Sequence, residues 1–186
     1  MDIINITSPL IPEVIQKLKV GTLVLISGIV YTARDVAHKK LVHAINSYKE
    51  LPFSLEGQTL YYMGPSPARP GRVIGSAGPT TSGRMDVYTP TLLAAGLKAM
   101  IGKGGRSEEV KKAIKKYRAI YFVTIGGAGA LLSSAVKKAK VIAYPELAVE
   151  AIMQLELEEF PAIVANDIYG DDLFIEGKAG YRKGGL

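Results

Sequence analysis

Strand-like and helix-like runs alternate along this chain, and the alternation constrains the fold more than any other feature. The run AIYFVTIGG (119–127) is apolar apart from one threonine and its closing glycines, and it predicts a strand. The stretch before it, SEEVKKAIKKYR (107–118), places its apolar residues on one helical stripe and its lysines on the other side. Such alternation indicates an α/β protein. It is irregular enough that a pure doubly wound sheet is not assured.

The remaining segments divide into the same two kinds, within a single domain over residues 1–186 that has no repeats and no clear linker. The last residues, 178–186, are expected to form a loose tail. Strands are predicted over 22–33 (with a break at Gly28), 59–64 and 141–145, with two more in 160–177 joined by an Asn-Asp and Gly turn; helices are predicted over 34–48, 90–102 and 128–140.

The sequence contains no cysteine, which removes disulfides, thiolate catalysis and any iron–sulfur cluster ligated by this chain alone. The first residues lack the basic and apolar regions of a signal peptide. The longest apolar stretch, VGTLVLISGIV, is interrupted by polar residues and is too short to span a bilayer. We therefore expect a cytoplasmic protein without a membrane partner.

The formal charge is +6, and the positive charge gathers in the middle of the chain. Residues 98–140 hold 11 of the 23 Lys and Arg residues but only two of the 17 acidic residues. Much of this charge lies on the polar side of the helix predicted over 107–118, and no aromatic stacking run or nucleic-acid motif accompanies it. We interpret the basic region as a solvated helix surface and expect no nucleic-acid partner.

The glycine clusters do not match a nucleotide motif. Five residues separate Gly96 from Gly102 where a P-loop has four, and Leu132 stands where the dinucleotide fingerprint needs its third glycine. The only histidines, His38 and His43, are wrongly spaced for a zinc site, so no metal site is predicted. His38 follows Arg34 by one helical turn, which suits either a shared binding surface or an ordinary helix-surface histidine.

Three cations stand at predicted turns. Arg34 lies at a strand-to-helix junction, Arg84 in the loop GPTTSGRMDVYTP (78–90), and Lys103 in IGKGG. Arginine can bind a carboxylate with two parallel hydrogen bonds, and lysine supplies a point charge, so together they suit a small polycarboxylate. Thr80 or Thr81 beside them could act as a proton acceptor, because nearby positive charge lowers the pKa of a hydroxyl.

Six motifs in order resemble those of one enzyme family: YTARDVAHKK, YYMGPSP, GSAGPTTSGRMD, MIGKGG, GGAGALL and EEFPAIVAND. The family is the β subunit, or C-terminal domain, of class I fumarate hydratases and L(+)-tartrate dehydratases, and the resemblance covers roughly residues 3–175. It implies a swivelling three-layer β/β/α domain with a mixed sheet. It also implies a hydro-lyase with a [4Fe–4S] cluster ligated by an α subunit, a small dicarboxylate substrate and a hetero-oligomer that is inactive without that subunit.

The resemblance also implies roles for individual residues. Arg34, Arg84 and Lys103 match substrate-binding positions, and Thr80 matches the proposed base, with Thr81 as the alternative if the register differs by one. The candidate lining residues are Asp35, His38 and Gly104. The expected reaction interconverts fumarate and L-malate; a tartrate or other hydroxy-diacid dehydratase remains open, as does a non-catalytic anion-binding regulatory module.

Overall fold

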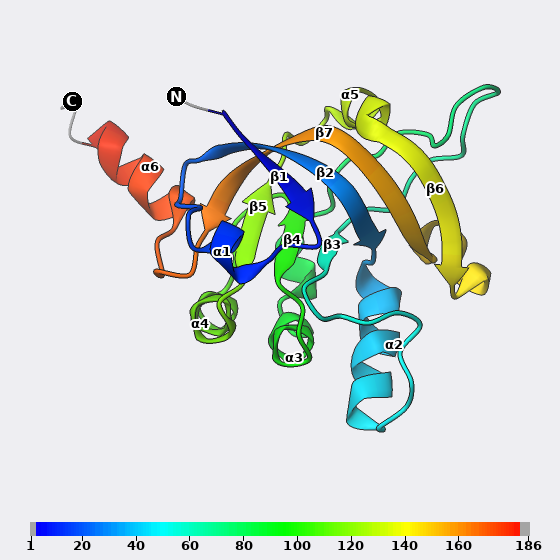
Figure 1. Cartoon of the computed structure of the whole chain (residues 1–186), viewed down its shortest axis with the longest axis horizontal. Coiled ribbons are helices and arrows are strands. Elements are labelled where there is room, and N and C mark those ends of the chain that lie inside the picture. Colours follow the sequence, from blue (N-terminus) through cyan, green and yellow to red (C-terminus); the bar gives the residue numbers. More distant parts are fainter. Residues whose placement is uncertain (1–2, 183–186) are drawn as a thin grey trace.

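The computed structural model describes residues 3–182 of the 186-residue chain (Figure 1). Its strands are β1 (Ile3–Ser8), β2 (Leu23–Thr32), β3 (Thr59–Tyr61), β4 (Ala99–Gly102), β5 (Ile120–Val123), β6 (Val136–Ala143) and β7 (Ile152–Asn166). Its helices are α1 (Pro12–Ile15), α2 (Asp35–Asn46), α3 (Thr89–Ala94), α4 (Glu108–Tyr117), α5 (Gly129–Leu132) and α6 (Leu173–Arg182), with 3-10 turns η1 (Ser82–Met85), η2 (Ser133–Ala135) and η3 (Pro145–Glu150).

The strands form one mixed sheet in the order β1-β2-β3-β4-β5-β7-β6, in which β2 also pairs with β7. Neighbours from β1 to β5 are parallel, whereas β7 runs antiparallel to β2, β5 and β6. This arrangement confirms the predicted mixed α/β class. Of the described helices, none is long and apolar enough to cross a membrane.

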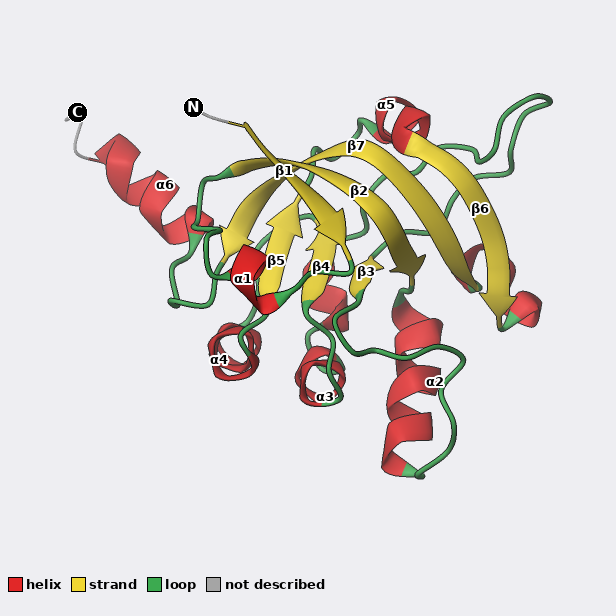
Figure 2. Cartoon of the chain, in the orientation of Figure 1, coloured by secondary structure: helices red, strands yellow, loops and turns green. Residues whose placement is uncertain are grey.

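Two apolar cores lie on opposite faces of the short strands β3, β4 and β5. Successive side chains of a strand point to opposite faces. Leu60, Met100 and Tyr121 therefore pack with the apolar residues of α2, α3 and α4, which lie along one side of these strands (Figures 1 and 2). Tyr61 and Phe122 instead pack in the second core, with residues of β1, β2 and β7.

The break predicted at Gly28 is wrong, because β2 continues through this residue, and the irregularity is a β-bulge whose extra residue lies on β7. The pairing register between β2 and β7 shifts between Ile26 and Gly28, and Gly28 has a φ of +96°, which an L side chain rarely adopts. A Cβ at this position would also collide with the carbonyl oxygen of Ser8 on β1. Glycine is thus required where β2 passes close to its neighbour.

The helices predicted over 34–48 and 107–118 are confirmed as α2 and α4. The Ser107 side chain caps α4 by accepting a hydrogen bond from the Val110 N–H. The predicted strands 22–33, 59–64 and 119–127 appear as β2, β3 and β5, although β3 ends at Tyr61.

The helix predicted over 90–102 is wrong beyond its first turn and a half. Helix α3 ends at Ala94, and Gly96 then adopts a φ of +107° with its backbone packed against Glu56. Residues 99–102 form β4, which is buried between β3 and β5. Burial in the centre of the sheet outweighs the helix-like spacing of this segment.

Two predictions near the C-terminus are also wrong. The segment 128–140 forms only the four-residue helix α5 and η2, and from Val136 onward it becomes the strand β6, which also takes up most of the strand predicted over 141–145. Pairing with β7 stabilises β6 through the ion pairs Lys137–Glu158 and Lys138–Glu156.

In the predicted pair of strands over 160–177, the first is the end of β7, but the second is the start of helix α6. Asp172 begins this helix by accepting a hydrogen bond from the Phe174 N–H. Of the tail expected over 178–186, the part up to Arg182 continues α6, and residues 183–186 lie outside the described residues.

Candidate functional site

The candidate site lies where four parallel strands end. Arg34 follows β2 by two residues, Gly64 follows β3, Lys103 follows β4 directly, and Thr124 follows β5. Carboxyl ends of parallel strands meet at one edge of a sheet, where ligands of open α/β sheets usually bind. Segments distant in the sequence therefore converge at this edge.

The loop that carries Thr80 and Thr81 extends the sheet beyond β4. The Thr80 N–H donates to the Tyr62 carbonyl oxygen (2.6 Å), and the Lys103 N–H donates to the Thr80 carbonyl oxygen (3.3 Å). The Ser82 N–H in turn donates to the Lys103 carbonyl oxygen (2.9 Å), so Thr81 pairs with Lys103 as in a parallel ladder. The backbone thus fixes both threonines beside Lys103, with Thr80 buried and Thr81 exposed.

Arg84 binds the first residue of α2. Its Nε donates to Asp35 Oδ1 (3.0 Å), and its Nη2 donates to Asp35 Oδ2, which makes a two-pronged ion pair. The Arg84 side chain is still 53% exposed, compared with 26% for Asp35. Asp35 therefore orients the guanidinium and leaves about half of it accessible to a ligand.

Arg34 precedes α2 and has a less complete set of partners. Its Nε lies 3.6 Å from Glu150 Oε1, and this buried nitrogen has no hydrogen-bond partner among the described residues. Gly64 makes room for the side chain, because a Cβ there would lie 2.7 Å from Arg34 Cζ. The Arg34 side chain is 22% exposed, so an anion could reach part of the guanidinium, although not the buried Nε.

Lys103 crosses the end of β5. An ideal Cβ built at Gly126 would lie 3.4 Å from Lys103 Cδ, so the aliphatic part of the lysine runs over the glycine backbone. Gly104, which follows, has a φ of +80° and is exposed. The turn at Gly104 ends the extended backbone of β4 just after the lysine.

A buried cation, Arg106, supports the site from behind. Its Nε donates to Asp86 Oδ1 (2.8 Å), its Nη2 donates to Thr89 Oγ1 (2.7 Å), and its guanidinium lies over the Tyr121 ring. Burial alone would lower the pKa of Arg106, but nearby groups, among them Tyr62 and Asp86, outweigh burial and raise it. Arg106 thus stays charged and anchors the residues that follow η1.

His38 lies in the buried core behind this edge rather than on the exposed surface of α2. Its ring is fully buried and packs edge-on against Tyr62, and both ring nitrogens lack hydrogen-bond partners among the described residues. Burial, together with the charge of Arg106, lowers the pKa of His38 to about 3. The ring is therefore neutral in the folded protein at any pH above about 4.

This neutral histidine predicts an acid-sensitive stability. The unfolded chain binds a proton at His38 below pH 6.5, whereas the folded chain does not until about pH 3, so stability falls as the pH drops through this range. At pH 5 the loss from this one group is about 2 kcal/mol. Denaturant unfolding at pH 8 and pH 5 measures the difference in the free energy of unfolding. For His38→Leu this difference is expected to be about 2 kcal/mol smaller than for the wild type.

The exposed second histidine provides the matched control. His43→Leu is expected to retain the wild-type difference between pH 8 and pH 5. A His38→Leu variant with the same pH dependence as the wild type would contradict a neutral buried His38.

The structure brings together, at one sheet edge, the residues that sequence analysis singled out, apart from the buried His38: Arg34, Asp35, Thr80, Thr81, Arg84, Lys103 and Gly104. The supporting residues Glu150, Asp86 and Arg106 were missed. Their partners lie from 17 to 116 residues away along the chain, and no local spacing signals such contacts.

Comparisons with known proteins assign the family. The family model described as the fumarase C-terminus matches residues 1–177, and the chain therefore belongs to this family. Its relatives include the anaerobic class I fumarate hydratase of Escherichia coli strain K12, which is 41% identical over 157 residues. Fumarate hydratase 2 of Leishmania major is 38% identical over 157 residues.

The relatives differ in how much of their length the chain covers. The two matches to these fumarate hydratases cover 83% of this chain but only 29% and 28% of the relatives, respectively. A putative L(+)-tartrate dehydratase subunit β from Methanocaldococcus jannaschii is 38% identical, with 91% of this chain and 90% of the relative covered. The family thus includes long chains and a separate β subunit of about the length of this chain.

Proposed function

We propose that this chain is the β subunit of a two-subunit hydro-lyase that interconverts fumarate and L-malate. The observation that carries the proposal is the convergence of Arg34, Arg84 and Lys103 with Thr80 at one sheet edge, in a chain that belongs to the fumarase family. Three cations beside a buried hydroxyl suit a dicarboxylate that must lose a carbon-bound proton.

Each residue has a proposed part in the reaction. The half-exposed guanidinium of Arg84 and the incompletely paired Arg34 bind substrate carboxylates, and Lys103 adds a point charge. Thr80, deprotonated among these cations, takes the proton from one carbon of malate. The electron pair of that C–H bond forms the double bond, and the hydroxyl of the neighbouring carbon leaves as water with a proton supplied from outside these residues.

A threonine hydroxyl is a weak base in water, so the proposal requires positive charge nearby and little bulk solvent. Thr80 is 9% exposed, which meets part of this requirement. Arg84 is open to solvent, which leaves room for a second subunit to close the site. The name of the Methanocaldococcus relative, a subunit β of similar length, supports a separate partner.

The residues of this chain do not fit a [4Fe–4S] cluster. The sequence has no cysteine, and within residues 3–182 no three His, Asp or Glu side chains are grouped so that they could hold a metal ion. We therefore assign the cluster that the resemblance implies to the α subunit. Of the steps proposed above, the binding of the carboxylates and the abstraction of the carbon-bound proton use residues of this chain.

We also propose that the chain has the swivelling β/β/α architecture. The two cores on opposite faces of β3, β4 and β5 support it, because they require a helical layer on one side and further strands on the other.

L(+)-tartrate is the second candidate substrate. The tartrate dehydratase relative matches this chain over nearly its full length, whereas the longer relatives are named as fumarate hydratases. Tartrate carries one hydroxyl more than malate, and contacts to that hydroxyl could come from the partner. A non-catalytic anion-binding module is less well supported, because it has no need of a buried hydroxyl beside the three cations.

Co-expression with the α subunit tests the proposal. The purified chain alone is expected to show no hydratase activity, and the assembled pair is expected to hydrate fumarate. Rates with fumarate, L-malate and L(+)-tartrate in parallel identify the substrate. Turnover by the isolated chain would contradict the two-subunit proposal, and an assembled pair that acts on none of the three would contradict the proposed reaction.

A further inference from the structure

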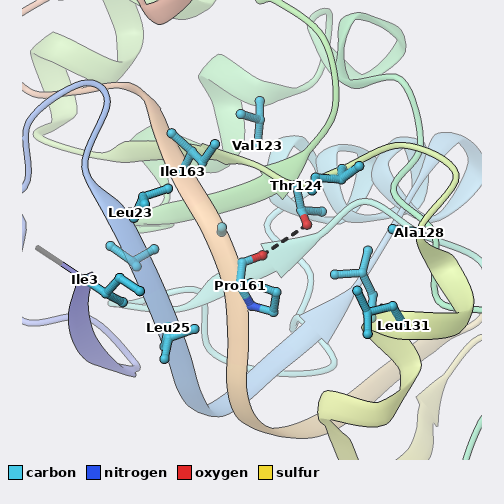
Figure 3. Close-up of a pocket in the computed structure, with 13 residues that line it drawn as sticks. Ile3, Leu23, Leu25, Val123, Thr124, Ala128, Leu131, Pro161 and Ile163 are labelled. Atoms are coloured by element: carbon cyan, nitrogen blue, oxygen red, sulfur yellow. Dashed lines mark hydrogen bonds between the residues drawn. The ribbon is translucent and has the colours of Figure 1, made fainter. Parts of the chain in front are cut away.

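An apolar groove of about 320 Å³ opens on the outer side of the sheet (Figure 3). Strands β1, β2 and β7 form one wall, and the end of β5 with helix α5 forms the other. The lining residues that matter below are Ile3, Thr124, Ile125, Leu131 and Pro161.

The lining suits an apolar partner. Thr124 is the one lining residue with a polar side chain, and its hydroxyl already donates to the Pro161 carbonyl oxygen (3.0 Å, Figure 3). At the rim, Ile125 is 70% exposed, Leu131 67% and Ile3 57%. Large aliphatic side chains left this open along one groove mark a surface that another molecule covers.

The groove is continuous with the candidate site. Thr124 and Ile125 line it, and Gly126, the next residue, lies against the Lys103 side chain. A partner protein that covers the site at Lys103 therefore also reaches the opening of the groove, because Gly126 directly follows the lining residue Ile125. A single contact with that partner can both exclude water from Thr80 and cover the groove.

The position of the first strand indicates which partner covers the groove. Ile3, at the groove rim, begins the first strand, β1, and the matching family model is described as the fumarase C-terminus. In the anaerobic fumarate hydratase of Escherichia coli, about 70% of the length lies outside the match. A segment that precedes a matched C-terminal domain would enter it through the counterpart of β1, which begins at the groove rim.

We propose that the groove is the docking surface for the α subunit, that is, for the polypeptide corresponding to the part of the fumarate hydratases that this chain does not match. The proposal rests on the proposed function. The partner inserts apolar side chains between α5 and the β1–β2–β7 wall, and this contact holds it over the sheet edge that carries Lys103.

The docking surface is tested by measuring the dissociation constant between the purified α subunit and purified variants of this chain. Leu131→Glu and Ile125→Glu are each expected to raise the dissociation constant by roughly 10- to 100-fold, because they place a charge in an apolar contact. Both side chains are exposed, so the variants should fold. Val141→Glu is the matched control: Val141 is 45% exposed on β6, lies outside the groove, and should leave the dissociation constant unchanged.

The outcomes separate this proposal from the proposed function. Wild-type affinity in both groove variants would overturn the docking surface even if the assembled pair is active. Weakened binding with no activity on any dicarboxylate would uphold the surface and overturn the function. A wild-type chain that self-associates, and that becomes monomeric with Leu131→Glu, would assign the groove to a second copy of this chain instead.

Discussion

Thr80→Ala is expected to lower kcat of the proposed two-subunit hydro-lyase by roughly 10²- to 10⁴-fold with little change in KM, if the hydroxyl is the general base. The backbone N–H and carbonyl of Thr80 hold the loop between Tyr62 and Lys103, and alanine keeps both hydrogen bonds. The substitution thus removes the proton acceptor and leaves the neighbouring cations in place. Steady-state kinetics with L-malate measure the effect.

Two further variants distinguish a base from a residue that merely packs. Thr80→Ser retains a hydroxyl and is expected to keep much of the rate. Thr81→Ala, next in the chain and exposed, is expected to be close to wild type. A large loss in Thr81→Ala with near-normal turnover in Thr80→Ala would move the base by one residue. Normal turnover in both would show that neither threonine is the base.

Arg84→Lys is expected to lower kcat/KM by roughly 10- to more than 100-fold, which corresponds to about 1.5–3 kcal/mol. Lysine keeps the positive charge but loses the planar fork. The bidentate contact with Asp35 orients the Arg84 guanidinium before substrate binds. Lysine therefore loses both the bidentate contact with the substrate carboxylate and this orientation. Initial rates over a range of substrate concentrations separate KM from kcat.

Arg118→Lys is the matched control for this substitution. Arg118 is exposed just before β5, at the opposite end of that strand from the candidate site, and the same chemical change there should leave kcat/KM at the wild-type value. An Arg84→Lys variant indistinguishable from Arg118→Lys would remove Arg84 from the carboxylate-binding set.

The sequence predicts much of the candidate site because its residues stand in short, distinctive segments. Arg34 lies where a strand pattern gives way to a helix pattern, and Thr80 and Arg84 share a loop rich in glycine and proline. The contacts of these residues could not be predicted. The pair between Arg84 and Asp35 joins positions 49 residues apart, and such a contact appears only when the chain has folded.

The errors in the fold arise where tertiary pairing outweighs local pattern. Residues 99–102 continue a helix-like spacing, yet they form the strand β4 because both neighbours, β3 and β5, pair with it. Residues 136–140 also favour a helix by composition but pair with the long strand β7. In both cases the partner strand lies elsewhere in the sequence, and local propensity carries no information about it.

The central claim is that a residue of this chain exchanges a proton with a carbon of the substrate. The most direct measurement is the rate at which the assembled enzyme transfers deuterium from D₂O into the carbon-bound position of L-malate, compared between wild type, Thr80→Ala and Thr81→Ala. We predict that Thr80→Ala still binds the dicarboxylate but loses this exchange along with turnover, whereas Thr81→Ala retains both. Exchange at the wild-type rate in Thr80→Ala would contradict the claim.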